Sequence, residues 1–175
     1  MTFFILSLYA ALFVCYAGVI IFFLYTLYAF VKGAPFVPTA KKNVKKMLAL
    51  ADLRQTDVLM DLGSGDGRIL FAAAPNVRQC IGIEINPLLY WWSRIRTRVK
   101  RLNNVQIIRK NLWDVDLSSV DVISLFFIHP KMGKLLKKFD AELKPGARVV
   151  SYAFSFPNRE PAKREGNIFL YIFSP

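Results

Sequence analysis

The sequence has few of the residues on which disulfide scaffolds, zinc sites and hydrolytic triads depend. It contains two cysteines, Cys15 and Cys80, too few for a disulfide framework or a multi-cysteine zinc site. The single histidine, His129, argues against a histidine-based metal site and against a Ser-His-Asp triad. We therefore expect no bound metal.

Acidic residues are also scarce, with 12 Asp and Glu against 24 Lys and Arg, which gives a net charge of +12. A basic balance of this size favours an anionic neighbour, namely a membrane surface, a nucleic acid or an acidic partner. The hydrophobic share of 54% excludes general disorder, and 175 residues are enough for one domain with an appendage.

Charged residues are absent from the first 31 positions, and Lys32 is the first to appear. This stretch exceeds the ~20 residues that a helix needs to cross a bilayer. A signal peptide would have a basic start, a shorter apolar stretch and a small-residue cleavage site. A core helix of a small domain is rarely apolar on every side. The pattern predicts a single transmembrane helix over residues 1–32.

Lysines gather directly after this stretch, at Lys32, Lys41, Lys42, Lys45 and Lys46. By the positive-inside tendency, we expect the rest of the chain on the cytoplasmic side of a bacterial inner membrane or, alternatively, of an organellar membrane. The same lysines also fit an ordinary solvated helix face.

The remaining residues alternate short apolar strands with helical segments. Residues 33–52 are predicted to be a linker and a helix, and residues 53–175 one domain. The alternation predicts an α/β, Rossmann-like, doubly wound sheet that is mainly parallel. We expect about six strands and a shortened C-terminal edge, because residues 157–167 are too few for a helix plus another strand.

A glycine-rich loop follows the first strand and opens a helix, at the place where doubly wound sheets bind ligands. Its residues are Asp61, Leu62, Gly63, Ser64, Gly65, Asp66, Gly67 and Arg68. A dinucleotide would place its pyrophosphate beside the acids Asp61 and Asp66, which would repel it. S-adenosylmethionine has an ammonium and a sulfonium but no phosphate, and Asp61 can hold its amino group. We therefore expect this cofactor, held by Asp61, Gly63, Ser64, Gly65 and Gly67.

Two later strand ends complete the predicted cofactor site. Glu84 ends the second strand, where a carboxylate can accept both hydroxyls of a ribose, and Ile85 follows it. Asn111 and Leu112 come after the third strand. We expect them near the adenine, since Asn111 offers both donors and acceptors.

The order of these motifs, DLGSGDGR, IGIEINP and LKPGARVV, resembles the class I, seven-strand S-adenosylmethionine-dependent methyltransferases over residues 57–150. With the uncharged span and residues 34–39 in front, the chain resembles more closely the membrane-anchored protein-lysine methyltransferases of the adenine nucleotide translocase and of the ATP synthase c ring protein, with their prokaryotic relatives. The resemblance implies a single-span anchor and methyl transfer to a lysine, most simply of a membrane protein. It assigns the methionine part to Asp61 and the glycines, and the ribose to Glu84.

The resemblance also implies that a proline-aromatic segment, here Pro35 and Phe36, helps to close the substrate pocket. Phe126 is a candidate for the wall of that pocket and His129 for a proton acceptor. Ordinary core packing and a structural histidine are the alternatives. The family's fourth strand ends in a Tyr-Leu-Leu-Pro type segment, whereas this chain has Leu125 to Pro130 without a hydroxyl.

Three other functions stay open. The acceptor could be a small or lipid-like molecule, or the chain could be a non-catalytic adaptor that binds the cofactor. A nucleic acid fits less well, because the Asn/Asp-Pro-Pro-aromatic segment of many nucleobase methyltransferases is absent after the fourth strand. The oligomeric state does not follow from the sequence.

Overall fold

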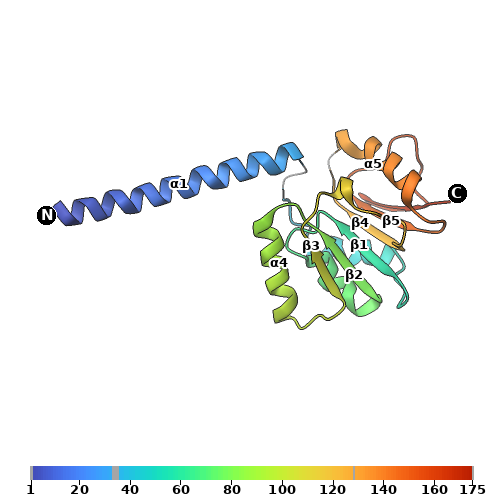
Figure 1. Cartoon of the computed structure of the whole chain (residues 1–175). Coiled ribbons are helices and arrows are strands. Elements are labelled where there is room, and N and C mark those ends of the chain that lie inside the picture. Colours follow the sequence, from blue (N-terminus) through green and yellow to red (C-terminus); the bar gives the residue numbers. More distant parts are fainter. Residues whose placement is uncertain (1, 33–35, 128, 175) are drawn as a thin grey trace. The chain divides into compact units, whose positions relative to one another are not determined.

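The computed structural model describes residues 2–32, 36–127 and 129–174. Internal contacts divide the chain into two units, residues 1–35 and residues 36–175. Each unit is described by itself (Figure 1).

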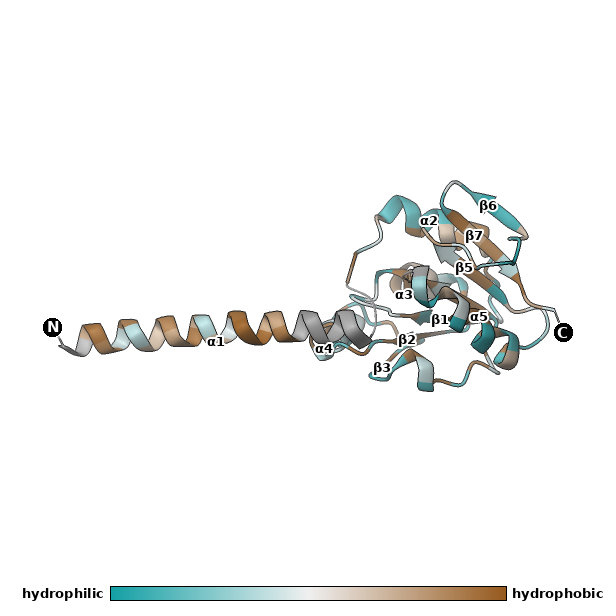
Figure 2. Cartoon of the chain, turned by 90° about the horizontal axis from the view of Figure 1, so that it is seen from above, coloured by the Kyte–Doolittle hydropathy of each residue, from teal (hydrophilic) through white to brown (hydrophobic). Residues whose placement is uncertain are grey.

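The first unit is one helix, α1 (Thr2–Lys32). Its segment Phe4–Leu24 has 21 residues, no buried position, and the length and apolar composition that a membrane crossing requires. Apolar side chains recur along this segment in Figure 2. An N-terminal signal sequence has the same length and composition, so these features alone do not distinguish it from a span.

The second unit is built on a seven-stranded sheet with the order β3-β2-β1-β4-β5-β7-β6. The five strands from β3 to β5 are parallel, and β7 and β6 are antiparallel to their neighbours. The strands are β1 (Val58–Leu62), β2 (Gln79–Ile83), β3 (Val105–Ile108), β4 (Val122–Leu125), β5 (Arg148–Tyr152), β6 (Lys163–Glu165) and β7 (Ile168–Ile172). The predicted Rossmann-like, mainly parallel fold is confirmed.

The expected number of about six strands is wrong, because residues 157–167 contain the short strand β6. That expectation assumed a parallel crossover, which needs a helix. An antiparallel partner needs only a tight turn, and Gly166 (φ +58°) provides it between β6 and β7.

Helices lie on both faces of this sheet, as Figure 1 shows. They are α2 (Lys41–Leu50), α3 (Arg68–Ala73), α4 (Pro87–Val99) and α5 (His129–Glu142), with short 3₁₀ turns η1 (Ala74–Asn76) and η2 (Leu112–Asp114). Pro87 opens α4 as predicted, and the Asn86 side chain caps it by accepting from Leu88 N–H at 2.9 Å.

A buried ion pair ties the sheet together at the end opposite the glycine loop. Arg148, at the start of β5, donates to Asp57, just before β1, at 2.7 Å. The same guanidinium donates to the Ala51 carbonyl at 2.8 Å and to the Asp52 carbonyl. Arg148 thereby fixes the end of α2 against the two strands.

Candidate functional site

The glycine loop between β1 and α3 takes a conformation that only glycines adopt without strain. Gly63, Gly65 and Gly67 have φ values of +85°, +54° and +80°. The N–H groups of Gly63 and Ser64 both donate to the Ile83 carbonyl, at 2.9 and 3.0 Å. The loop is therefore fixed to the end of β2.

The three glycines differ in what surrounds them. A Cβ added at Gly63 would meet nothing within 4 Å, so this α-carbon faces open space. A Cβ at Gly65 would come within 2.6 Å of the Phe36 ring, which therefore lies directly on the loop. Pro35, expected beside Phe36, lies outside the described residues. One side of the loop is open and another is covered by an aromatic ring.

Asp61 lies near the end of β1 and is almost fully buried, at 2% exposure. Its Oδ1 accepts a hydrogen bond of 2.6 Å from the Ser124 hydroxyl on β4. Burial raises the pKa of Asp61 to about 7, against the lowering effect of that hydrogen bond, and the charges of Glu84 and Asp66 add to the rise. Both neighbouring charges that act on this carboxyl are thus negative.

Glu84 directly follows β2 and is also buried. One carboxylate oxygen accepts from Gly65 N–H at 2.8 Å and the other from Asn86 N–H at 2.7 Å. Burial raises the pKa of Glu84, although these backbone hydrogen bonds oppose the rise. Because β1 and β2 are parallel neighbours, with Leu62 opposite Ile83, the two acids meet at one edge of the sheet.

The other acid of the loop, Asp66, is bound by two arginines. Arg68 donates to it at 2.9 Å and Arg96, from α4, at 2.6 Å. Partial burial raises the pKa of Asp66, but these hydrogen bonds outweigh burial and hold the pKa below its usual value. Asp66 therefore joins the loop to α4 rather than facing a ligand.

Asn111 and Leu112 lie just beyond the carboxyl end of β3, the strand next to β2. Asn111 Oδ1 accepts from Trp113 N–H at 3.2 Å, and Leu112 is buried. Ile85 directly follows Glu84 and is partly buried. The residues predicted from three separate motifs thus meet beyond the ends of β1, β2 and β3.

An aromatic cluster lies on the other side of β1, at the ends of β4 and β5. The Phe126 ring meets Tyr152 edge to face, with centroids 5.1 Å apart, and stacks with Phe154 at 6.2 Å. The Tyr152 hydroxyl accepts from Asn43 Nδ2 at 2.8 Å. Sequence reasoning missed Tyr152 and Phe154, although aromatics after the fifth strand were the available signal. Tyr152 also brings a hydroxyl to the region where β4 lacks one.

His129 is the first residue of α5, and its side chain is not among those described. Within residues 2–32, 36–127 and 129–174, no three His, Cys, Asp or Glu side chains lie close enough to share a metal ion. Ser64 Oγ is buried without a hydrogen-bond partner among the described residues, and it packs against the α-carbon of Gly82.

These features fit S-adenosylmethionine and not a phosphate-bearing ligand. Asp61 and Glu84 form a buried anionic pair without an opposing cation among the groups that act on Asp61. A cationic ligand would relieve the repulsion between them, whereas a pyrophosphate would increase it. The open space at Gly63 lets a ligand approach the backbone beside this pair.

Comparison with known proteins agrees with this chemistry. A family model described as the ANTKMT methyltransferase domain matches residues 61–163. A protein-lysine N-methyltransferase of Saccharolobus islandicus is 34% identical over 82% of this chain and 96% of its own length. The lysine N-methyltransferase of the ATP synthase c ring protein from Xenopus laevis is 38% identical over 73% of this chain and 56% of its own. The chain thus spans just over half of that vertebrate relative.

Among solved structures, an RNA methyltransferase from Salinibacter ruber in complex with S-adenosyl-L-homocysteine has a TM-score of 0.75 and 35% identity. The match covers 79% of this chain and 94% of that one. A similar backbone therefore holds the demethylated form of the expected cofactor.

Proposed function

We propose that this chain, which belongs to the ANTKMT methyltransferase family, transfers a methyl group to a lysine side chain of a protein in or at a membrane. The expected enzyme class and cofactor are confirmed: the chain is an S-adenosylmethionine-dependent methyltransferase. Lysine as the acceptor is supported by the relatives, which are named as lysine methyltransferases of the ATP synthase c ring protein and of the adenine nucleotide translocase.

The observation that carries the cofactor assignment is the buried pair of Asp61 and Glu84 at neighbouring strand ends. Asp61 holds the cofactor ammonium, since Oδ1 keeps the Ser124 hydrogen bond and the second oxygen stays available. Each Glu84 oxygen accepts one backbone N–H and retains a second lone pair for a ribose hydroxyl. Asn111, Leu112 and Ile85 border the adenine, and the glycine loop borders the methionine part.

The bound cofactor supplies an activated methyl group on a positively charged sulfur, a good leaving group. The chain's own task is to align the acceptor, exclude water and keep the lysine amine neutral. An aromatic wall disfavours the charged ammonium by desolvation and also accommodates the methylated product. We assign this wall to Phe126, with Tyr152 and Phe154, and the cover to Phe36. His129 is proposed to take up the proton.

The membrane location rests on the segment Phe4–Leu24, which we propose as a single transmembrane anchor. The lysines after it place the methyltransferase domain on the cytoplasmic side, by the positive-inside tendency. Tethering to the same bilayer raises the effective concentration of a membrane-protein acceptor.

The test uses the full chain, native membranes and S-adenosylmethionine labelled on the methyl group. Label that maps to lysine of a membrane protein supports the proposal. Label in a lipid extract would contradict it in favour of a small acceptor, and cofactor binding without any transfer would indicate an adaptor. The Asp61→Asn variant is the control for transfer that depends on the bound cofactor.

RNA is the second candidate acceptor, because the relative from Salinibacter ruber is described as an RNA methyltransferase. The same reaction is therefore run with total RNA added. Label in RNA that exceeds the label in protein would favour this candidate.

A further inference from the structure

Positive charge is concentrated in one stretch of the methyltransferase domain. Between Glu84 and Asp114 there is no acidic residue. The stretch contains seven basic residues: Arg94, Arg96, Arg98, Lys100, Arg101, Arg109 and Lys110. It includes α4 and the edge strand β3, so the charge lies at one margin of the sheet.

Helix α4 also exposes large apolar side chains. These are Leu88, Trp91, Trp92, Ile95 and Val99, between 50% and 77% exposed. At 100° per residue, the five fall within an arc of about 100° around the helix. Arg94 and Arg98 lie along one margin of this arc, and Arg96 lies along the other. We call the five residues the apolar arc of α4.

The apolar arc is not the face by which α4 joins the core. Ser93, the fully buried residue of this helix, lies on the opposite side of the helix. α4 packs over β3 through that opposite side. A surface helix ordinarily turns its apolar stripe inward, so an outward stripe marks a contact with something outside the domain.

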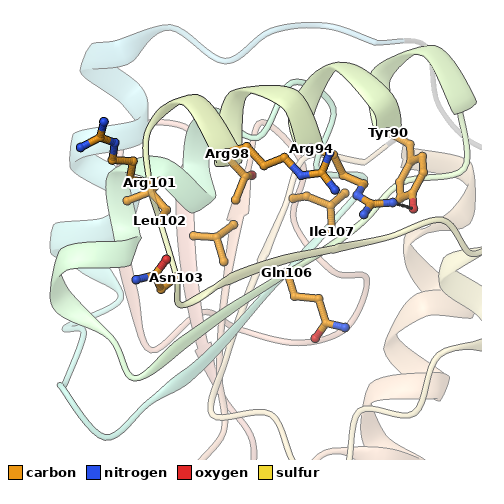
Figure 3. Close-up of a pocket in the computed structure, with 10 residues that line it drawn as sticks. Tyr90, Arg94, Arg98, Arg101, Leu102, Asn103, Gln106 and Ile107 are labelled. Carbon is orange, nitrogen blue, oxygen red and sulfur yellow. Dashed lines mark hydrogen bonds between the residues drawn. The ribbon is translucent and has the colours of Figure 1, made fainter.

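A hollow of about 790 Å³ opens beside the arc, between α4 and β3. It is lined by Tyr90, Arg94, Arg98, Arg101 and Gln106, among others, as Figure 3 shows. Arg94 donates to the Tyr90 hydroxyl at 2.8 Å and lies over the Tyr90 and Trp91 rings. Arg94, Arg98 and Arg101 have no carboxylate partner within the described part of the chain.

We propose that α4 lies on an anionic bilayer surface, with its apolar arc in the headgroup region and Arg94 and Arg98 on lipid phosphates. Two tryptophans with aliphatic neighbours and flanking arginines form the composition of an interfacial helix. RNA fits the arginines but not exposed Leu88, Ile95 and Val99. This contact is separate from the proposed methyl transfer and does not depend on it.

The experiment uses the full chain in vesicles whose acyl chains carry bromine, which quenches tryptophan emission on contact. The sequence has three tryptophans, so the Trp113→Phe variant reports only Trp91 and Trp92. We expect at least about twofold stronger quenching when the vesicles contain phosphatidylglycerol than when they contain phosphatidylcholine alone, because each arginine near the surface adds to the attraction. The Arg94→Gln/Arg98→Gln variant should lose this difference.

The matched control is Lys163→Gln/Arg164→Gln, which removes the same charge from β6 at the far edge of the sheet and should keep the difference. Equal quenching in both lipids, or none, would overturn the proposal. So would protection of Trp91 and Trp92 from a soluble quencher by RNA but not by vesicles. If Trp113→Phe does not fold, the native chain is compared with Trp91→Phe/Trp92→Phe, which should lose the lipid-dependent quenching.

Discussion

Ser124 and Asp61 are direct partners across β4 and β1, joined by a hydrogen bond of 2.6 Å from the serine hydroxyl to the buried carboxylate. These strands meet where the order of the sheet reverses, since β1 is followed by β2 on one side and by β4 on the other. Such a reversal is where doubly wound sheets bind their ligands. Ser124 therefore orients the acid that we assign to the cofactor ammonium.

Replacing Asp61 by Asn removes the charge but keeps the shape of the side chain. We expect at least a tenfold loss of affinity for S-adenosylmethionine, because a charge-assisted hydrogen bond contributes about 1.5–3 kcal/mol. Isothermal titration calorimetry measures it. The Asp116→Asn variant, which changes an exposed acid, is the control and should bind normally. Unchanged affinity in Asp61→Asn would show that the cofactor is placed wrongly.

The pKa of Asp61 also predicts how stability depends on pH in the absence of cofactor. The folded pKa of about 7 lies above the ordinary value of 3.8, so the folded state retains a proton that the unfolded state releases. Stability should therefore fall as pH rises from about 4 to 7, by on the order of a few kcal/mol from this group. Thermal melts across this range should show the fall, and Asp61→Asn should lack most of it.

Cofactor binding should depend on pH in the opposite sense. An ammonium beside Asp61 favours the ionised carboxylate, so binding lowers the pKa and releases a proton below pH 7. We expect affinity to rise between about pH 6 and 8. Calorimetry at pH 6.5 in buffers of different ionisation enthalpy should reveal the released proton. A binding enthalpy that is the same in all of those buffers would contradict this assignment.

Gly63 and Gly146 offer a matched test of the glycine loop. Both have φ above +80°, and a Cβ at either would meet nothing within 4 Å. Alanine should cost each about 1–2 kcal/mol of stability, because both positions require left-handed backbone. Only Gly63→Ala should also weaken cofactor binding, since its methyl group would enter the space left for the ligand. Equal cofactor affinity in the two variants would mean that the ligand does not approach Gly63.

The aromatic cluster should affect the acceptor and not the cofactor. We expect Phe126→Ala to lower kcat/KM for the protein acceptor at least about tenfold, because the wall that favours a neutral lysine is lost. Cofactor affinity, measured separately, should change little. Phe139→Leu, a core substitution away from this cluster, controls for general loss of stability. A parallel loss of cofactor affinity in Phe126→Ala would assign Phe126 to the other pocket.

The buried pair of Arg148 and Asp57 predicts a purely structural effect. Arg148→Ala leaves the Asp57 carboxylate buried without its partner, which costs about 3–5 kcal/mol. Chemical denaturation measures this loss. Because the pair lies at the opposite end of the strands from the glycine loop, cofactor affinity of the folded fraction should be retained.

Sequence reasoning found the parts of the site that follow one another along the chain. The glycine loop, Glu84 and the opening of α4 at Pro87 are each signalled by local residue order, and each lies at the end of a strand as expected. Ser124 could not be found in this way, because its role depends on the register that places it opposite Asp61. Tyr152 and Phe154 likewise reach Phe126 only through the pairing of β4 with β5.

The loop acid Asp66 shows the same limit from the other side. Local residue order does not decide whether it contacts a ligand or caps the loop, because its arginine partner Arg96 is 30 residues away. β6 was missed for a different reason. A three-residue hairpin strand has too short an alternation to be read from composition alone.

The edge strand β6 ends the sheet with three exposed, charged residues, Lys163, Arg164 and Glu165. A bare strand edge would otherwise offer its free backbone groups to a neighbouring copy, and charged side chains discourage such pairing. Enzymes held on one bilayer meet one another at high local density, where fibre-like association would be most damaging. Replacing these charges with valine should therefore lead to aggregation before it affects turnover.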